Sequence, residues 1–133
     1  MTAFTAVLLY LIWMVALTLV YAGYRIPLVL TGQKSADHWG RGRPSDDPAI
    51  LQRAKDAHLN CVENFALFAG VVLVASAMGE MALANALGAY VLYARIGQSV
   101  AHLIGTSFLL VLIRATFFII QLLLILYMAI DLL

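Results

Sequence analysis

Residues 3–24 run for 22 consecutive positions without a charged side chain. A helix rises about 1.5 Å per residue, so this stretch is long enough to cross a hydrocarbon core of about 30 Å. Over the whole chain 64% of residues are hydrophobic and only 11% are charged, whereas soluble domains carry about 25% charged residues. A soluble fold of 133 residues could not hide so much apolar surface. We therefore expect an integral membrane protein.

Four helices are expected along the chain, in a single domain covering residues 1–133. The first uncharged stretch predicts a helix that ends near Arg25 and Pro27, where a charge and a proline follow the apolar run. Residues 81–130 hold only two charges in 50 positions, which is too long for one span, so they predict two helices joined near residues 105–107. The expected helices cover about residues 3–25, 48–78, 82–104 and 108–131.

Residues 31–48 are the only continuous polar stretch and are expected to form a loop. Asp47 is the expected N-cap of the second helix, with Pro48 at the first helical position, a favoured arrangement. A helix from Pro48 to Met78 would be roughly 46 Å long, more than the bilayer core requires. We therefore expect its first turns to stand outside the membrane.

The basic residues are distributed unequally between the two sides of the membrane. Six of them surround the first loop, and the second loop and both chain ends carry none. Loops rich in Lys and Arg stay in the cytoplasm, so the first loop is expected to be cytoplasmic and both termini are not. The six residues are Arg25, Lys34, Arg41, Arg43, Arg53 and Lys55.

Several classes of protein are disfavoured by composition. The formal net charge is only +1, so no basic field suggests a nucleic-acid partner. The single cysteine, Cys61, excludes an intramolecular disulfide framework, and His38, His58 and His102 lack the spacing of metal ligands, so no metal site is expected. The first apolar stretch has no basic n-region or cleavage site and is read as a retained helix rather than a signal peptide.

Polar residues form stripes on three of the expected helices. On the second helix one stripe falls within an arc of about 100°; on the third, polar residues recur at i, i+3, i+4 and i+7; on the fourth, Arg114 and Gln121 share a face. The alternating directions of the helices bring these stripes together from the middle of the membrane to its cytoplasmic half. The stripe residues of the second and third helices are Arg53, Asp56, Asn60, Glu63, Asn64, Arg95, Gln98, Ser99 and His102.

Two interpretations of these stripes remain open. Ionisable residues inside membrane spans are often functional, which favours a polar pocket that opens to the cytoplasm between apolar walls. Alternatively, Glu63 and Arg95 form a structural ion pair, and Asn60, Asn64 and Gln98 hydrogen-bond between helices. His58 is expected to be an interhelical hydrogen-bonding residue and Cys61 a small buried hydrophobic one.

The second helix also carries a recognisable pattern. Arg53-x4-His58-Leu59-Asn60-x2-Glu63-Asn64, followed by Phe68, resembles the signature of the MAPEG family, the membrane-associated proteins of eicosanoid and glutathione metabolism. The step Ala94-Arg95-Ile96 in the third helix is similar to a second landmark of that family. With the four-span pattern and the polar first loop, the resemblance covers nearly the whole chain.

The resemblance implies an all-α homotrimer of four-helix subunits that binds glutathione between neighbouring subunits near the cytoplasmic side. It implies that Arg114, at the start of the fourth helix, steadies the glutathione thiolate and is the catalytic residue. A thiolate is the nucleophilic form of a thiol, and a nearby Arg favours it. The residues implied to line the glutathione site are Arg53, Asn60, Glu63 and Arg95, with Gln98 and His102 beside them on the third helix.

Three functions are therefore in competition. The leading hypothesis is a glutathione-dependent membrane transferase or peroxidase that acts on lipophilic electrophiles or lipid hydroperoxides, which would enter from the bilayer. The alternative is a non-catalytic lipid-binding or scaffold member of the same fold. The second-helix motif favours the enzyme. The third helix favours the binding protein, because it holds Gln98 and His102 at positions where the mammalian enzymes of the family often carry His or Tyr. A small four-helix exporter would need a carboxylate in the first span, which contains none.

Overall fold

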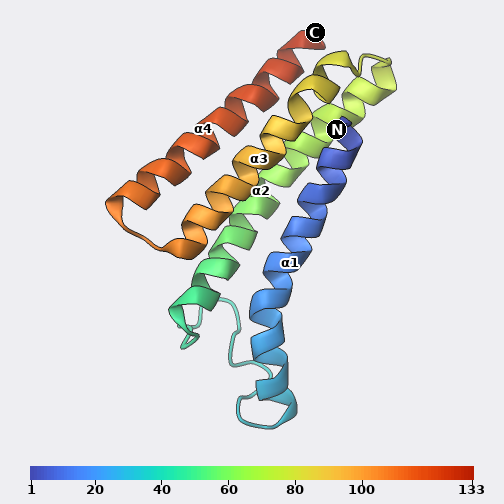
Figure 1. The fold of residues 1–133 in the computed structure, drawn as a ribbon. Helices are drawn as coiled ribbons and strands as arrows, with labels where there is room; N and C mark the ends of the chain where they lie inside the picture. Colours follow the sequence, from blue (N-terminus) through green and yellow to red (C-terminus); the bar gives the residue numbers. More distant parts are fainter.

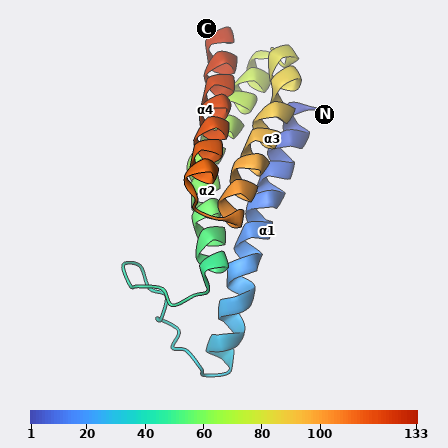
Figure 2. The ribbon, with the colours of Figure 1, turned by 60° about the vertical axis from the view of Figure 1, so that its left-hand side comes forward.

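A computed structural model describes residues 1–133. Four antiparallel helices run up and down through the molecule, with no strands, which confirms the expected all-α bundle (Figure 1). The polar loop and the turn between the last two helices lie at one end of the bundle, called here the loop end, and both termini lie at the other (Figures 1 and 2). The helices are α1 (Ala3–Leu30), α2 (Ala49–Met78), α3 (Ala82–Ile104) and α4 (Phe108–Asp131).

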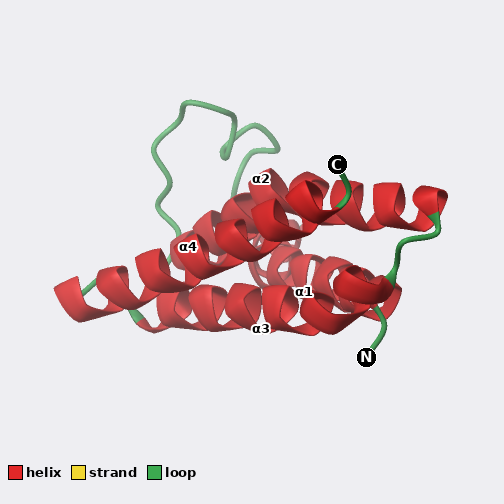
Figure 3. Cartoon of the chain, turned by 90° about the horizontal axis from the view of Figure 1, so that it is seen from above, coloured by secondary structure: helices red, strands yellow, loops and turns green.

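Three of these helices, α1, α2 and α4, are long and apolar enough to cross a membrane. α3 is less apolar because its second half carries Arg95, Gln98, Ser99 and His102. It nevertheless packs against each of the other three, whereas α4 rests mainly on α3 (Figure 3). α4 makes no close contact with α1. The polar face of α3 is therefore turned into the bundle, where Arg95, Gln98 and Ser99 are all buried.

At the terminal end, α1 and α3 approach each other closely. A Cβ on Gly88 would lie only 3.1 Å from the Cα of Ala3, so this contact depends on a residue without a side chain. The backbone N–H of Ala3 donates to Oδ1 of Asn85 at 2.8 Å. This bond satisfies one of the amide donors that the first turn of a helix leaves free. It also joins the start of α1 to α3.

α1 extends beyond its expected end near residue 25, because Pro27 does not stop it. A proline removes one N–H donor and crowds the carbonyl four residues earlier, which here belongs to Gly23. No atom beyond its own stretch of helix lies within 4 Å of a Cβ built on Gly23, so neighbouring elements do not crowd this turn. The helix then closes normally, since the N–H and hydroxyl of Thr31 both donate to the carbonyl of Pro27, at 3.0 and 2.8 Å.

The sequence predicts Asp47 as the N-cap of the second helix, and this prediction is wrong. α2 begins at Ala49 with Pro48 as N-cap and no side-chain capping bond. The Asp47 carboxylate instead accepts hydrogen bonds from Nε of Arg25 and Nε1 of Trp39, both at 2.9 Å. Burial alone would raise the pKa of this carboxyl, but the bonds from Arg25 and its other donors hold the pKa below its usual value. The Asp47 side chain therefore forms an ion pair with Arg25 instead of capping α2.

The polar loop is held by a second acidic residue. Asp46 accepts hydrogen bonds from Lys34 and from Nε2 of His38, the latter at 2.8 Å. These bonds lower the pKa of Asp46 to about 2. Arg25, which pairs with Asp47, also lies over the rings of Tyr21 and Trp39, at 5.4 and 5.2 Å from their centroids. Charged residues therefore link the loop internally, through Asp46, and hold it to α1, through Asp47 and Arg25.

Candidate functional site

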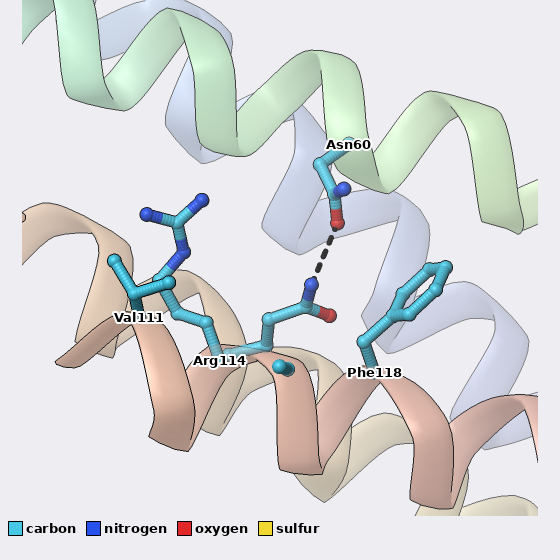
Figure 4. A pocket seen from close by; sticks show the side chains of 6 residues that line it. Asn60, Val111, Arg114 and Phe118 are labelled. Carbon is cyan, nitrogen blue, oxygen red and sulfur yellow. Dashed lines mark hydrogen bonds between the residues drawn. The ribbon is translucent and has the colours of Figure 1, made fainter. Parts of the chain in front are cut away.

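A cavity of about 230 Å³ opens between α2, α3 and α4 in the loop-end half of the bundle. Its polar wall comes from Asn60 on α2 and Gln98 on α3, and its apolar wall from α4 (Figure 4). Arg114 also comes from α4, so a cation stands between the polar and the apolar surfaces. The α4 residues that line the cavity are Val111, Arg114, Ala115 and Phe118.

Asn60 is the centre of the polar wall. Its Oδ1 accepts hydrogen bonds from Nη1 of Arg95 and, at 3.0 Å, from Nε2 of Gln98, the bond dashed in Figure 4. Its backbone carbonyl accepts from Nδ2 of Asn64, one turn further along α2, at 3.0 Å. The stripes of the second and third helices therefore do meet, and Asn60 is the residue at which they join.

Arg95 lies behind this wall rather than in it. The side chain has no exposed surface and does not line the cavity. Besides Asn60, it donates from Nη2 to Oε1 of Gln121 on α4, and its guanidinium lies 5.6 Å from the centre of the Tyr10 ring. Arg95 is thus held by two neutral amides and an aromatic face.

The ion pair between Glu63 and Arg95 that the sequence suggested is absent. Glu63 is exposed on the outer face of α2, whereas Arg95 points to the interior. Around the axis of a helix, position 63 lies about 60° from position 60 on one side, and position 64 lies about 40° from it on the other side. Asn60 takes the inward place, and the carboxylate of Glu63 is left on the surface of the subunit.

Two arginines and a histidine lie close together beside the cavity, towards the loop end. Nε of Arg53 donates to the carbonyl of Leu103 at 2.9 Å, in the last turn of α3, where free carbonyls attract a positive charge. His102 is half-buried and lies within electrostatic reach of Arg53, Asp56 and Arg114. Arg114 forms no ion pair, and its Nε is buried without a hydrogen-bond partner. An unpaired guanidinium in this position suits an anionic ligand.

Two members of this network were not identified as site residues from the sequence. The only sequence feature that distinguishes Gln121 is that it lies on the same face of the fourth helix as Arg114. Tyr10 lies in the uncharged first stretch, where nothing distinguishes it from other apolar residues. In the structure Tyr10 is fully buried and its hydroxyl donates to the carbonyl of Cys61 at 3.0 Å.

The remaining singled-out residues have structural positions. His58 faces α1, where its Nδ1 lies 3.0 Å from the hydroxyl of Tyr21, as expected for an interhelical hydrogen bond. Cys61 is buried, as expected, with its Sγ 3.4 Å from Oγ of Ser99. Two adjacent aromatic residues of α4 lie in different places: Phe118 lines the cavity, whereas Phe117 packs over Gly97 of α3.

Comparison with known proteins identifies one relationship. The model of the MAPEG family matches residues 2–133, essentially the whole chain. No curated protein and no solved structure matches the chain.

Proposed function

Since the chain belongs to the MAPEG family, and is thus an integral membrane four-helix bundle of the glutathione and eicosanoid group, we propose that it is a glutathione-dependent membrane transferase or peroxidase. Its second substrates are lipophilic electrophiles or lipid hydroperoxides. The observation that carries the proposal is the cavity itself, in which the unpaired Arg114 stands between a polar amide wall and an apolar wall.

Arg114 is the proposed catalytic residue. Glutathione is anionic, and loss of its thiol proton adds a further negative charge that an unpaired guanidinium stabilises. In the transferase reaction the thiolate sulfur forms a bond to the electrophilic carbon, and the leaving group departs with its electron pair. Val111 and Phe118, beside Arg114, offer the electrophile an apolar surface at the point of attack.

The other site residues are proposed to bind the tripeptide. Asn60 and Gln98 face the ligand from the polar wall. Arg53 offers positive charge to its carboxylates beside the cavity, and His102 offers a hydrogen-bonding imidazole. Glu63 is the proposed partner of the α-ammonium group. Arg95, which does not reach the cavity, contributes through Asn60.

A homotrimer is part of the proposal, because one subunit leaves the site incomplete. About 230 Å³ is below the roughly 300–1,000 Å³ of ordinary small-molecule pockets. Glu63 is exposed on a membrane-spanning helix, and a charge facing lipid is costly unless a neighbour or a ligand covers it. A neighbouring copy packed against α2 would enlarge the cavity and cover Glu63. Native mass spectrometry in mild detergent tests this assembly, and a purely monomeric spectrum contradicts it.

The orientation proposed is the one in which the loop end faces the cytoplasm. The six basic residues around the first loop support it, and the cavity lies in the same half of the bundle. Cytoplasmic glutathione would then reach Arg114 without crossing the membrane.

The activity is tested by incubating purified protein in lipid nanodiscs with glutathione and a generic aryl halide. Formation of the thioether above the uncatalysed rate supports the proposal, and Arg114→Ala provides the inactive comparison. Calorimetric titration of glutathione, with wild-type protein and with Glu63→Gln, measures binding independently of turnover. Absence of both binding and thioether formation in the wild type would refute the enzyme.

One feature favours the non-catalytic lipid-binding alternative. An entirely apolar groove of about 470 Å³ lies between α2 and α4 towards the terminal end. It has the character of a site for an acyl chain, with Leu67, Val71 and Met78 on one side and Ile125 and Ala129 on the other. A protein that binds lipid without forming the thioether in the assay above would be this alternative.

A further inference from the structure

Arg95 carries a positive charge that nothing in the chain neutralises. Its side chain is fully buried, it makes no ion pair, and its Nε has no hydrogen-bond partner. The two groups that accept its protons are neutral amide oxygens, those of Asn60 and Gln121. A guanidinium does not lose its proton in proteins, and a buried charge without a counter-ion is costly. This buried charge lies directly behind Asn60, which lines the cavity.

The bond from Arg95 determines which way the amide of Asn60 is turned. A guanidinium can only donate, so the atom that faces it must be the oxygen of Asn60. Gln98 donates to the same oxygen. The amide nitrogen of Asn60 therefore points away from Arg95, and it makes no hydrogen bond within the protein. Asn60 lines the cavity and this unbonded nitrogen is not buried, so it is available as a donor to an occupant.

We propose that Arg95 and Gln121 are positioning residues that make this donor selective for a negatively charged group of the ligand. Arg95 polarises the Asn60 amide and adds its own uncompensated charge behind it. Gln121 anchors Arg95 while remaining neutral; a glutamate of the same shape would anchor it equally well and cancel its charge. This inference rests on the proposed function, since it takes glutathione as the anion that the cavity receives.

The substitution Gln121→Glu separates charge from structure. The carboxylate keeps an acceptor for Nη2 of Arg95, so a purely structural Gln121 predicts unchanged glutathione binding and equal or higher thermal stability. The proposed role predicts that the Kd for glutathione rises by roughly tenfold or more, because the new charge offsets that of Arg95 in a low-dielectric interior. Thermal stability is measured on the same samples.

Asn85→Asp is the matched control. It makes the same amide-to-acid change, keeps the oxygen that accepts from the N–H of Ala3, and lies at the opposite end of α3. Its Kd for glutathione is expected to equal that of the wild type. If Gln121→Glu also binds like the wild type, the proposal is overturned.

A second variant keeps the test decisive if Gln121→Glu does not fold. The double substitution Arg95→Met with Gln121→Met replaces the buried polar pair by apolar side chains, a change that membrane interiors and protein cores commonly tolerate. Its glutathione Kd is expected to rise by tenfold or more as well, roughly the factor expected for the charge alone. Wild-type affinity in a folded double variant would overturn the proposal. Failure of the wild type itself to bind glutathione would instead refute the proposed function.

Discussion

Gly97 of α3 lies directly under the ring of Phe117 on α4. A Cβ built on Gly97 would meet the ring at 2.8 Å from Cζ and 2.9 Å from Cε2, distances that real Cβ atoms do not adopt. α4 rests mainly on α3, so this contact sets how close the helix carrying Arg114 can come to the polar wall.

Gly97→Val is therefore expected to destabilise the bundle by about 1–3 kcal/mol, the usual cost of overpacking. Thermal unfolding in detergent measures it. Phe117→Ala removes the ring, so in its background Gly97→Val should cost much less. Equal costs in the two backgrounds would show that the ring does not limit the approach of α4.

Arg114→Ala is expected to lower turnover by about 100-fold, the order lost when one stabilising donor of an anionic intermediate is removed. Glutathione affinity should remain close to that of the wild type, because the proposed contacts of the tripeptide with Arg53, Asn60 and Glu63 are kept. The pKa of the bound thiol, followed by its ultraviolet thiolate absorbance, should rise. Arg114→Lys keeps the charge and should retain part of the activity. Unchanged turnover and thiol titration in Arg114→Ala would transfer the catalytic role to His102.

The polar loop is expected to loosen in acid. The pKa of Asp46 is lowered to about 2 by its bonds to Lys34 and His38, below the value of about 3.9 for a free aspartate. Its contribution to loop stability is therefore complete above about pH 4 and disappears as the pH falls towards 2. Hydrogen-exchange protection of residues 34–46 should fall over this range, and Asp46→Asn should lower that protection already at neutral pH. A loop equally protected in both proteins would contradict the role of Asp46.

Topology is tested by cysteine labelling from one side of intact cells, in a Cys61→Ala background. Ser35→Cys, in the polar loop, should react with a membrane-impermeant maleimide only after the membrane is broken. Glu80→Cys, in the turn at the terminal end, should react in intact cells. The reverse pattern would invert the orientation and place the cavity on the wrong side for cytoplasmic glutathione.

The helices of this protein follow from its sequence, since the physics that selects them is local. Uninterrupted apolar runs of about 20 residues have one stable form in a bilayer, the helix that satisfies its own backbone. The facing of most of the polar stripes also follows, because polar side chains in a span turn away from lipid, although Glu63 lies on the outer face of α2. Asn60, Gln98 and Arg114 were found in this way, and they line the same cavity.

The tertiary structure decided which partner each polar side chain takes. Arg95 had a carboxylate available on the neighbouring helix in Glu63, yet the rotation and depth of the helices bring it to Asn60 and to Gln121 from α4. Asp47 had a local role as N-cap, yet Arg25, 22 residues away, takes its carboxylate. Such choices depend on differences of a few ångströms between helices. Periodicity determines the face on which a residue lies, but only the packing of whole helices determines which atoms meet.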